Sequence, residues 1–531
     1  MYKKQLVTAF FLMVFAGVGW GQTPVAGDAA TLLNITRFII ESPNPLPEAQ
    51  TQALLVPHLG SHSDLASIEA AAVTLERAIR ADGHSFHWVI VPAQRPDSGV
   101  LTLRVLGFSL ADVTVSGNRF FSSASILRTL PALRSGSSPN LEAIGRNITL
   151  ANEHPAKRLN MQFRESTKPD HISAEVVVRD VPAAQTFIGL TGGGRDFDNN
   201  LNRNTGYTRL TVGHQRSNLF DRDHALTLAY TTSPDHLSKV SQYGVFYWMP
   251  LYGYHTSVSA YWTKSDIDTG NVGVGGVNFA VSGKGEFYGL RASYALPKTR
   301  LVAHSVSLAV DARYFESSVG FAGGVLPTTA VGSMPATLRY SARSDQLWGG
   351  IGGNIEYVHN LGSGRGNDAL AYTIVRATAG TNWNVIRWEA DAQYNFASRW
   401  SVSTKLRGQY ADDVLIPGEQ FGVGGVASVR GLREREATGD RGYTANFELV
   451  APAVYAGVVP FAFSDFGRRI HLAPVPGVAQ KDNVASVGLG ARWNWEKGLD
   501  ISVSYANVLN GVAGGTPRGH DKVNFSLFYR F

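Results

Sequence analysis

The chain has 531 residues, of which 44% are hydrophobic, 11% aromatic and 17% charged, and it contains no cysteine. A membrane-spanning helix needs about 20 consecutive apolar residues, which only the first residues approach, so a helical membrane protein is excluded, and the aromatic content excludes a disordered or collagen-like chain. The net charge of +6 is spread along the chain without a basic stripe for nucleic acid, and the lack of cysteine excludes disulfides, a thiol nucleophile and a cysteine–zinc site.

The N-terminus has the pattern of an export signal. Lys3 and Lys4 precede an apolar run from residue 6 to 18, and small residues surround Trp20. The run is short for a spanning helix, so we expect a signal peptide over residues 1–21 rather than a retained anchor, followed by a short linker over 22–31. The mature chain is therefore predicted to reach the periplasm or the outer membrane of a Gram-negative cell.

Residues 32–183 alternate strand-like and helix-like segments in two similar units, 32–108 and 109–183. Each unit has the order β-α-α-β-β over about 75 residues, and an internal repeat of this kind indicates stacked modules. Strands are expected at 32–40, 86–91, 100–106, 113–116, 159–164 and 172–179, and helices at 65–81, 122–132 and 141–152.

From residue 184 to 531, alternation with period two replaces helical spacing. In "HSVSLAVDARY", Val306, Leu308 and Val310 fall on one face, and Ser305 and Ser307 fall on the other. The same alternation recurs in "WSVSTKLRGQY", "LDISVSY" and "VNFSLFYRF". Strands of about ten residues with one apolar and one polar face are typical of a transmembrane β-barrel with a wet interior, although a soluble β-sandwich shows the same pattern.

The connections between these strands separate the two interpretations. About 16 strands are expected, and short links such as "PLYG" at Pro250 alternate with long ones, among them 411–442. Outer-membrane barrels have short periplasmic turns and long extracellular loops, whereas a sandwich has no reason to alternate link lengths in this way. A barrel of this size is wide enough for an aqueous interior.

The long connection around Arg430 has an unusual composition. It is rich in glycine, including Gly422, Gly424 and Gly425, yet carries many aliphatic residues, which suits a loop folded into a confined lumen. No helix follows the glycines, so a phosphate-binding loop is not indicated. On a later strand, Asp465 is an obvious partner for an inserted guanidinium, because charge-assisted bidentate pairs fix geometry as well as adding energy.

At this point the chain resembles the TpsB transporters of two-partner secretion, also described as haemolysin secretion/activation proteins. "SVRGL", with Val429, Arg430, Gly431 and Leu432, resembles the VRGY/F signature of their sixth extracellular loop, although Leu432 replaces the usual aromatic residue. "FSD", with Phe463 and Asp465, resembles the F-x-D signature of the receiving strand. "IVPAQ" and "VTVSGNRFFS" resemble parts of two POTRA modules, and the terminal "FSLFYRF" resembles the strand signal read by the barrel assembly machinery.

The resemblance implies two periplasmic α+β POTRA modules followed by an all-β transmembrane barrel of about 16 antiparallel strands, in the outer membrane. Arg430 would pair with Asp465 and latch the loop inside the lumen. The modules would capture an extended secreted partner polypeptide, β-helical once folded, by adding it as a strand to an exposed edge. That edge would be the middle strand of either module, with Phe86, Trp88 and Ile90 or Leu159, Met161 and Phe163. The barrel assembly signal would lie at Leu527, Tyr529 and Phe531.

No catalytic residue, cofactor or metal is expected, and the partners would be the secreted polypeptide, outer-membrane lipid and the barrel assembly machinery, without nucleic acid. An outer-membrane assembly factor of the same superfamily remains the main alternative, although such factors usually carry more POTRA modules. A general porin would lack the periplasmic repeats. An outer-membrane hydrolase is disfavoured because "GSHSD" at residues 60–64 is not a nucleophile elbow.

Overall fold

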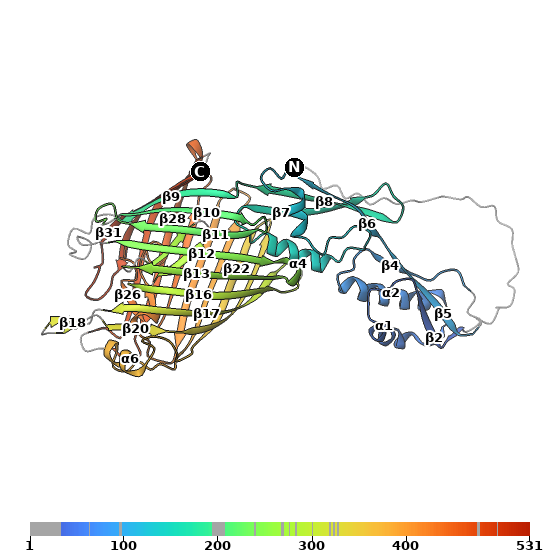
Figure 1. Ribbon diagram of the computed structural model, residues 1–531, viewed down its shortest axis with the longest axis horizontal. Coiled ribbons are helices and arrows are strands. Elements are labelled where there is room, and N and C mark those ends of the chain that lie inside the picture. The colour runs from blue at the N-terminus through green and yellow to red at the C-terminus, as the bar shows by residue number, and fades with distance from the viewer. Residues whose placement is uncertain are drawn as a thin grey trace. The chain divides into compact units, whose positions relative to one another are not determined.

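The computed structural model describes most of the chain from residue 33 onward (Figure 1). The described residues are 33–531 without 63, 95–97, 194–207, 238–239, 267–269, 275–276, 282–283, 300, 318–319, 322–323, 326–328, 475–477 and 496–497. The predicted signal peptide and linker, residues 1–31, lie outside them. The chain divides into two compact units: one extends to Ile79 and includes His87–Leu106, and the other comprises Arg80–Phe86 and Gly107–Phe531.

The first unit is a small α+β module. Its elements are β1 Leu33–Ile35, β2 Arg37–Glu41, α1 Glu48–Leu55, η1 Val56–His58, β3 Gly60–His62, α2 Leu65–Ala81, β4 His87–Ile90 and β5 Val100–Gly107. The sheet has the order β2-β5-β4, and the apolar stripe of α2, including Leu75 and Ile79, packs on it. The single strand expected at 32–40 was wrong: the main chain of Thr36 bonds to Gly99, so β1 pairs with β3 while β2 pairs with β5.

The second unit begins with a module of the same topology. Its elements are β6 Ser109–Ser116, α3 Ser123–Arg128, α4 Leu141–Ala151, β7 Lys157–Glu165 and β8 His171–Asp180, with sheet order β6-β8-β7. The side chains of Ser122 and Asn140 accept hydrogen bonds from the first turns of α3 and α4, which fixes where the helices begin. The helix expected over 122–132 is shorter than predicted, because Pro131 disfavours helical backbone in the residue before it.

The rest of the second unit is a closed antiparallel barrel, which confirms the predicted fold class. Its strands are β9 Ala184–Gly193, β10 Thr208–Leu219, β11 His224–Thr232, β12 Ser241–Leu251, β13 Thr256–Ser265, β16 Gly285–Ala295, β17 Ala303–Ser317, β20 Thr329–Ser333, β21 Pro335–Gln346, β22 Gly349–Asn360, β23 Asn384–Asn395, β24 Ser401–Ala411, β27 Arg441–Val450, β28 Val458–Ile470, β29 Lys481–Trp495, β30 Leu499–Asn510 and β31 Asp521–Arg530. β20 and β21 pair with successive parts of β17 and are two segments of one interrupted strand. Counted in this way, the described strands form a barrel of 16 strands, which the pairing of β31 with β9 closes.

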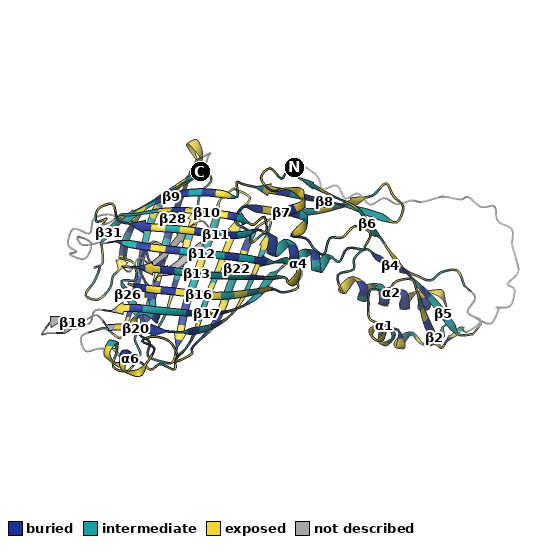
Figure 2. Ribbon diagram, viewed as in Figure 1, coloured by how far each residue is buried: buried dark blue, intermediate teal, exposed yellow. Residues whose placement is uncertain are grey.

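Burial in the barrel is inverted relative to a soluble protein. On β17, Leu308 is 62% exposed, while its neighbour Ser307 is 7% exposed and Asp311 is 5% exposed. Figure 2 shows buried and exposed residues alternating along the barrel strands. Apolar side chains therefore face outward and polar side chains face the lumen, which is the arrangement of a barrel that meets lipid.

The connections alternate in length as predicted. Short turns such as 220–223 and 252–255 alternate with longer connections that hold elements of their own, namely β14 Gly270–Val274, β15 Val277–Val281, β18 Gly320–Phe321, β19 Gly324–Val325 and α6 Ala369–Val375. The tight turn at 347–348 and the short helix α6 had not been expected. Among the described residues, no helix is long and apolar enough to cross a membrane.

Candidate functional site

The connection between β24 and β27 folds into the barrel. It contains η3 Pro417–Glu419 and the two-stranded sheet of β25 Phe421–Val423 and β26 Ala437–Gly439. Its aliphatic residues form one buried cluster with side chains of the barrel wall, comprising Val423, Val429, Leu432, Ala437, Val484 and Val508. This contact with the wall explains why a glycine-rich loop carries so many aliphatic residues. We call this connection, residues 412–440, the lumen loop.

Arg430, at the tip of the lumen loop, binds Asp465 of β28. Its Nε and Nη2 donate to the two carboxylate oxygens over 2.7 and 2.6 Å, and its main-chain N–H donates to Oδ2 over 3.0 Å. Both residues are almost fully buried. Asn446 of β27 lies opposite Asp465 in the strand pairing and donates to it over 2.8 Å, and it also bonds the carbonyl of Ser428. The wall therefore fixes both the charge and the main chain of the tip.

Glu448 and Arg492, neither of which was predicted from the sequence, complete this group. Arg430 Nη1 donates to Glu448 Oε1 over 2.7 Å, and Glu448 in turn accepts from Arg492 of β29 over 2.7 and 2.9 Å. The Arg430 guanidinium also lies 3.5 Å from the ring centre of Phe463, within range of a cation–π interaction. Alternation along β27 places Glu448 on the same face as Asn446, and this was the available signal.

The residues beside Arg430 shape the turn of the tip. Gly431 has a φ of 97°, and a Cβ there would lie 2.8 Å from Val508 Cγ2, so both conformation and space require glycine. Leu432 stands where the VRGY/F signature has an aromatic residue. It is buried in the aliphatic cluster with Val508. Its position is filled by aliphatic packing rather than by ring stacking.

Two cavities lie beside the second module, and one of them extends to the lumen loop. The larger has a volume of about 880 Å³ and is lined at one end by Glu153, Pro155 and Arg158 of the second module and at the other by the lumen loop from Gly418 to Gly422. Its wall is strongly charged, with Arg291, Arg313, Arg339, Arg387 and Arg407 from the strands between β16 and β24. The lumen loop bounds this cavity.

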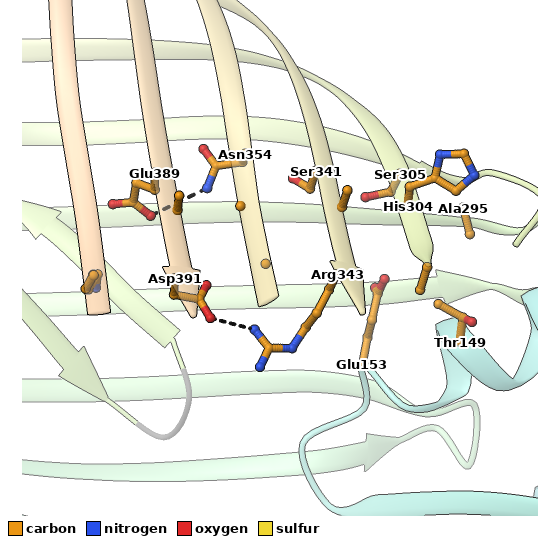
Figure 3. Close-up of a pocket in the computed structure, with 16 residues that line it drawn as sticks. Thr149, Glu153, Ala295, His304, Ser305, Ser341, Arg343, Asn354, Glu389 and Asp391 are labelled. Atoms are coloured by element: carbon orange, nitrogen blue, oxygen red, sulfur yellow. Dashed lines mark hydrogen bonds and ion pairs between the residues drawn. The ribbon is translucent and has the colours of Figure 1, made fainter. Parts of the chain in front are cut away.

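A smaller hollow of about 480 Å³ lies at the mouth of the barrel (Figure 3). Glu153 of the second module and Arg343 of β21 both line it. Arg343 Nη1 donates to Asp391 of β23 over 3.0 Å, so the mouth is polar and partly neutralised by ion pairs. Elsewhere in the described part of the chain, no group of three His, Asp or Glu side chains is arranged to hold a metal ion.

The strands expected to receive a partner are middle strands in chain order but edge strands in space. Among the described strands, β4 pairs only with β5, and β7 pairs only with β8. On β4, Trp88 and Ile90 are exposed, whereas Phe86 precedes the strand and its ring centre lies 4.8 Å from that of Phe163.

On β7 the predicted side chains point inward. Leu159 is buried and Met161 packs against the core of the module. The main-chain N–H and carbonyl of Leu159 both bond the Asn152 side chain, over 2.7 and 3.0 Å. The odd-numbered residues of β7 therefore turn their main-chain groups away from β8, so that Met161 and Phe163 continue the edge that no strand pairs with. The Met161 N–H donates there to the side chain of Asn160 over 2.9 Å, a local contact that an added strand would replace.

The C-terminal strand lies at the barrel closure. Tyr529 and Phe531 are exposed on the outer face with stacked rings 5.5 Å apart, and Leu527 is half-buried opposite Leu190 of β9. The main chains of Phe531 and Thr186 exchange hydrogen bonds of 2.9 Å in both directions. The predicted assembly signal is therefore the strand that completes the barrel.

A second buried polar group, which no motif of the sequence indicated, joins the second module to the barrel. Lys157 at the start of β7 donates to Asp223 in the β10–β11 turn over 2.6 Å, and Tyr252 in the β12–β13 turn donates to the same oxygen over 2.9 Å. His154 binds the Ser217 carbonyl over 2.5 Å through Nε2 and accepts from the Ala156 N–H at Nδ1. We call this group, Lys157, Asp223, Tyr252 and His154, the module joint.

Acidification should weaken the module joint through His154. Burial first, and then the nearby charge of Lys157, lower the pKa of His154 to about 4, against an ordinary value of 6.5, although Asp223 opposes the shift. Between pH 6.5 and 4, His154 binds a proton when the module joint is open but not when it is closed. The stability of the closed joint therefore falls as the pH falls through this window. The full loss, below pH 4, is about 3 kcal/mol.

The measurement is hydrogen exchange of α4 amides in the intact protein at pH 7, 5.5 and 4. Because glutamine does not titrate, His154→Gln should make the protection of the α4 amides less dependent on pH. An α4 whose protection is equally pH-dependent in wild type and variant would contradict the assignment to His154.

The chain is similar to known secretion proteins along most of its length. The model of the family described as haemolysin secretion/activation protein ShlB/FhaC/HecB matches residues 191–493. The outer membrane transporter CdiB of Dickeya dadantii (strain 3937) is 25% identical over 367 residues, which cover 65% of this chain and 59% of the relative. The chain thus spans less than two thirds of the length of that relative.

Two solved structures share the architecture. CdiB from Escherichia coli aligns with a TM-score of 0.73 at 16% identity, covering 96% of this chain and 93% of the other. CdiB from Acinetobacter baumannii aligns with a TM-score of 0.69 at 15% identity, covering 95% and 91%. At these identities the likeness establishes a common fold.

Proposed function

Because the chain belongs to the haemolysin secretion/activation protein family ShlB/FhaC/HecB, we propose that it is an outer-membrane transporter that captures an exported polypeptide through its two POTRA modules and secretes it through the barrel. The partner would enter extended and leave at the cell surface or into the medium. The family is one of transporters rather than enzymes, and the similarity to an outer membrane transporter supports an outer-membrane location.

One observation carries this proposal: the charged cavity of about 880 Å³ runs from the second POTRA module to the lumen loop. The module contacts the short turns at Asp223 and Tyr252, so these turns belong on the periplasmic side and the long connections on the outer side. A polypeptide delivered by the module would meet a wet, polar path and, at its end, the latched lumen loop.

Capture would use the open edges of β4 and β7. An added strand gains main-chain hydrogen bonds without strict sequence demands, which suits a long substrate whose side chains vary. The outward side chains of β7 beside that edge are Arg158, Asn160, Gln162 and Arg164, a polar and basic row. Transport needs no nucleotide at the outer membrane, because folding of a β-helical cargo outside would bias its movement. The C-terminal strand ending in Phe531 would be read by the barrel assembly machinery.

The test removes one outward main-chain donor from β7. Met161→Pro deletes the side chain and the N–H, whereas the control Met161→Ala deletes only the side chain. We expect Met161→Pro to lower secretion of the partner by about tenfold, because the added strand would lose one or two of its main-chain hydrogen bonds to β7. Met161→Ala should secrete the partner nearly normally.

Abundance in the outer membrane and heat-modifiability of the barrel verify that both variants fold. Equal secretion by the two variants would argue against capture at the β7 edge. Deletion of the whole gene distinguishes a transporter from an assembly factor. Loss of an assembly factor would impair many outer-membrane barrels, whereas loss of a transporter would abolish secretion of one protein and leave other barrels normal.

A further inference from the structure

A further attachment of the lumen loop lies at Glu419, eleven residues before Arg430. We propose that Glu419 is a positioning residue that anchors the loop to another sector of the barrel wall, between β17 and β23, so that the lumen opens only when this attachment is released as well as the one at Arg430. This inference rests on the proposed role of the lumen loop as the barrier to secretion.

The Glu419 carboxylate is enclosed by groups from three wall strands. It is 1% exposed, and it accepts from Arg313 of β17 over 2.8 and 3.1 Å, from Arg387 of β23 over 3.0 Å and from Ser333 of β20 over 2.6 Å. A buried carboxylate held by two guanidiniums and a hydroxyl has its hydrogen-bonding capacity well used, which is the condition for a stable buried ionic group.

Further contacts hold the guanidiniums and the loop main chain in register. Arg313 also donates to Asp311 over 2.7 Å, and Arg387 Nε donates to the Gln409 side chain over 2.9 Å. Gln409 in turn donates over 3.0 Å to the main-chain carbonyl of Glu419. The attachment therefore includes the main chain of the loop as well as its charge.

The two attachments lie on different parts of the wall. In the barrel order, the strands β20 and β21, β22, β23, β24 and β27 separate β17, which carries Arg313, from β28, which carries Asp465. The loop thus spans part of the lumen between them. Their polarity is reversed: at Arg430 the loop supplies the cation and the wall the carboxylates, whereas at Glu419 the loop supplies the carboxylate and the wall the cations.

A close approach of the loop to the wall supports the same conclusion. A Cβ built on Gly418 would lie 2.3 Å from the ring of Phe315 on β17, so the loop is pressed against the wall beside Glu419. If the loop moved at Arg430 alone, the segment through Gly418 and Glu419 would stay in the lumen beside β17. Release of the Arg430 tip is therefore insufficient to clear the channel.

The experiment measures channel opening without cargo. Purified Glu419→Gln, Arg430→Gln and the double variant are compared in planar bilayers. We expect Glu419→Gln to raise the fraction of time in the high-conductance state by roughly tenfold, the effect of losing hydrogen bonds to a charged group, even though Arg430 and Asp465 are intact. The double variant should exceed either single variant.

A second readout uses the absence of cysteine. Val429 is fully buried in the lumen loop, so Val429→Cys in this cysteine-free chain reports release of the loop by its rate of maleimide labelling. Glu419→Gln should accelerate labelling by a similar factor. The matched control is Asp412→Asn, since the Asp412 side chain is 75% exposed at the start of the same loop and pairs with Arg441, and it should change neither readout.

Charge reversal distinguishes an anchor from a residue that only supports folding. Glu419→Arg should open the channel, and adding Arg387→Glu should restore part of the closed state. Unchanged conductance and labelling in Glu419→Gln would overturn the second anchor. If the channel opens as expected but secretion of the partner is unaffected by every loop variant, the anchor stands and the secretion role of the lumen loop fails.

Discussion

Arg430→Ala is expected to release the tip of the lumen loop and to reduce secretion of the partner. It should also raise the fraction of time that the channel is open, because opening then requires one attachment fewer to break. The substitution leaves Asp465 fully buried with Asn446 as its one side-chain donor among the residues that the structure describes, and it also removes the contact with the Phe463 ring. Removing one partner of a buried pair typically costs 3–5 kcal/mol, because the other charge stays in place without compensation. The position of the lumen loop inside the barrel should therefore be destabilised by about the same free energy.

Companion variants make this result specific. Arg430→Lys keeps the charge but not the planar fork that reaches Asp465 and Glu448 together, so we expect an intermediate effect. Arg518→Ala, at an exposed arginine in the β30–β31 connection, is the matched control and should behave as wild type. Conductance in planar bilayers and secretion in cells are the measurements. Wild-type conductance and secretion in both Arg430→Ala and Asp465→Ala would contradict the proposal that Arg430 and Asp465 hold the lumen loop in place.

The second large effect is expected at the module joint. Lys157→Met preserves length and apolar contact but leaves Asp223 buried, with the Tyr252 hydroxyl as its remaining donor. We expect the joint to lose about 3–5 kcal/mol of stability and the second POTRA module to separate from the barrel more often. The expected observation is faster hydrogen exchange in α4 and easier proteolysis around residues 181–183, with the heat-modifiability of the barrel unchanged.

The same surface offers both a compensating variant and a control. Lys157→Met combined with Asp223→Leu removes both charges and should recover much of the stability, since a buried pair is often replaceable by apolar residues. Arg128 and Asp221 form a neighbouring pair whose side chains are 52% and 62% exposed, so Arg128→Ala should cost less than about 1 kcal/mol. If Arg128→Ala and Lys157→Met had equal effects, the special role of the buried pair would be refuted.

The sequence predicted the fold where local signals were strong. The apolar spacing of α2 predicted its bounds, Leu65–Ala81, and alternation predicted the barrel strands, because one face of each strand meets lipid. The turn at 347–348 was missed because Leu347 and Trp348 are apolar residues without a turn signature. The helix α6 was missed because its seven residues are too few to show a period.

The candidate site was predictable only in part, and for a physical reason. Arg430 and Asp465 could be paired because their motifs resemble those of known transporters, in which the two motifs are linked. Glu419 could not be identified as the partner of Arg313 and Arg387, since that pairing depends on which sector of the wall the loop touches. Lys157 and Asp223 are 66 residues apart and meet only after a module docks on a turn.

The inverted burial of the barrel reverses the usual guide to tolerated substitutions. In a soluble protein an exposed position such as Leu308 would be a safe place for a charged label, and a buried one such as Ser307 would be avoided. Here Leu308 faces hydrocarbon, where a lysine or arginine costs about 2–4 kcal/mol near the midplane, whereas a lumen position needs only room for its side chain. On the barrel wall, a charged substitution therefore belongs on a lumen-facing position with room for it rather than on an exposed apolar position such as Leu308.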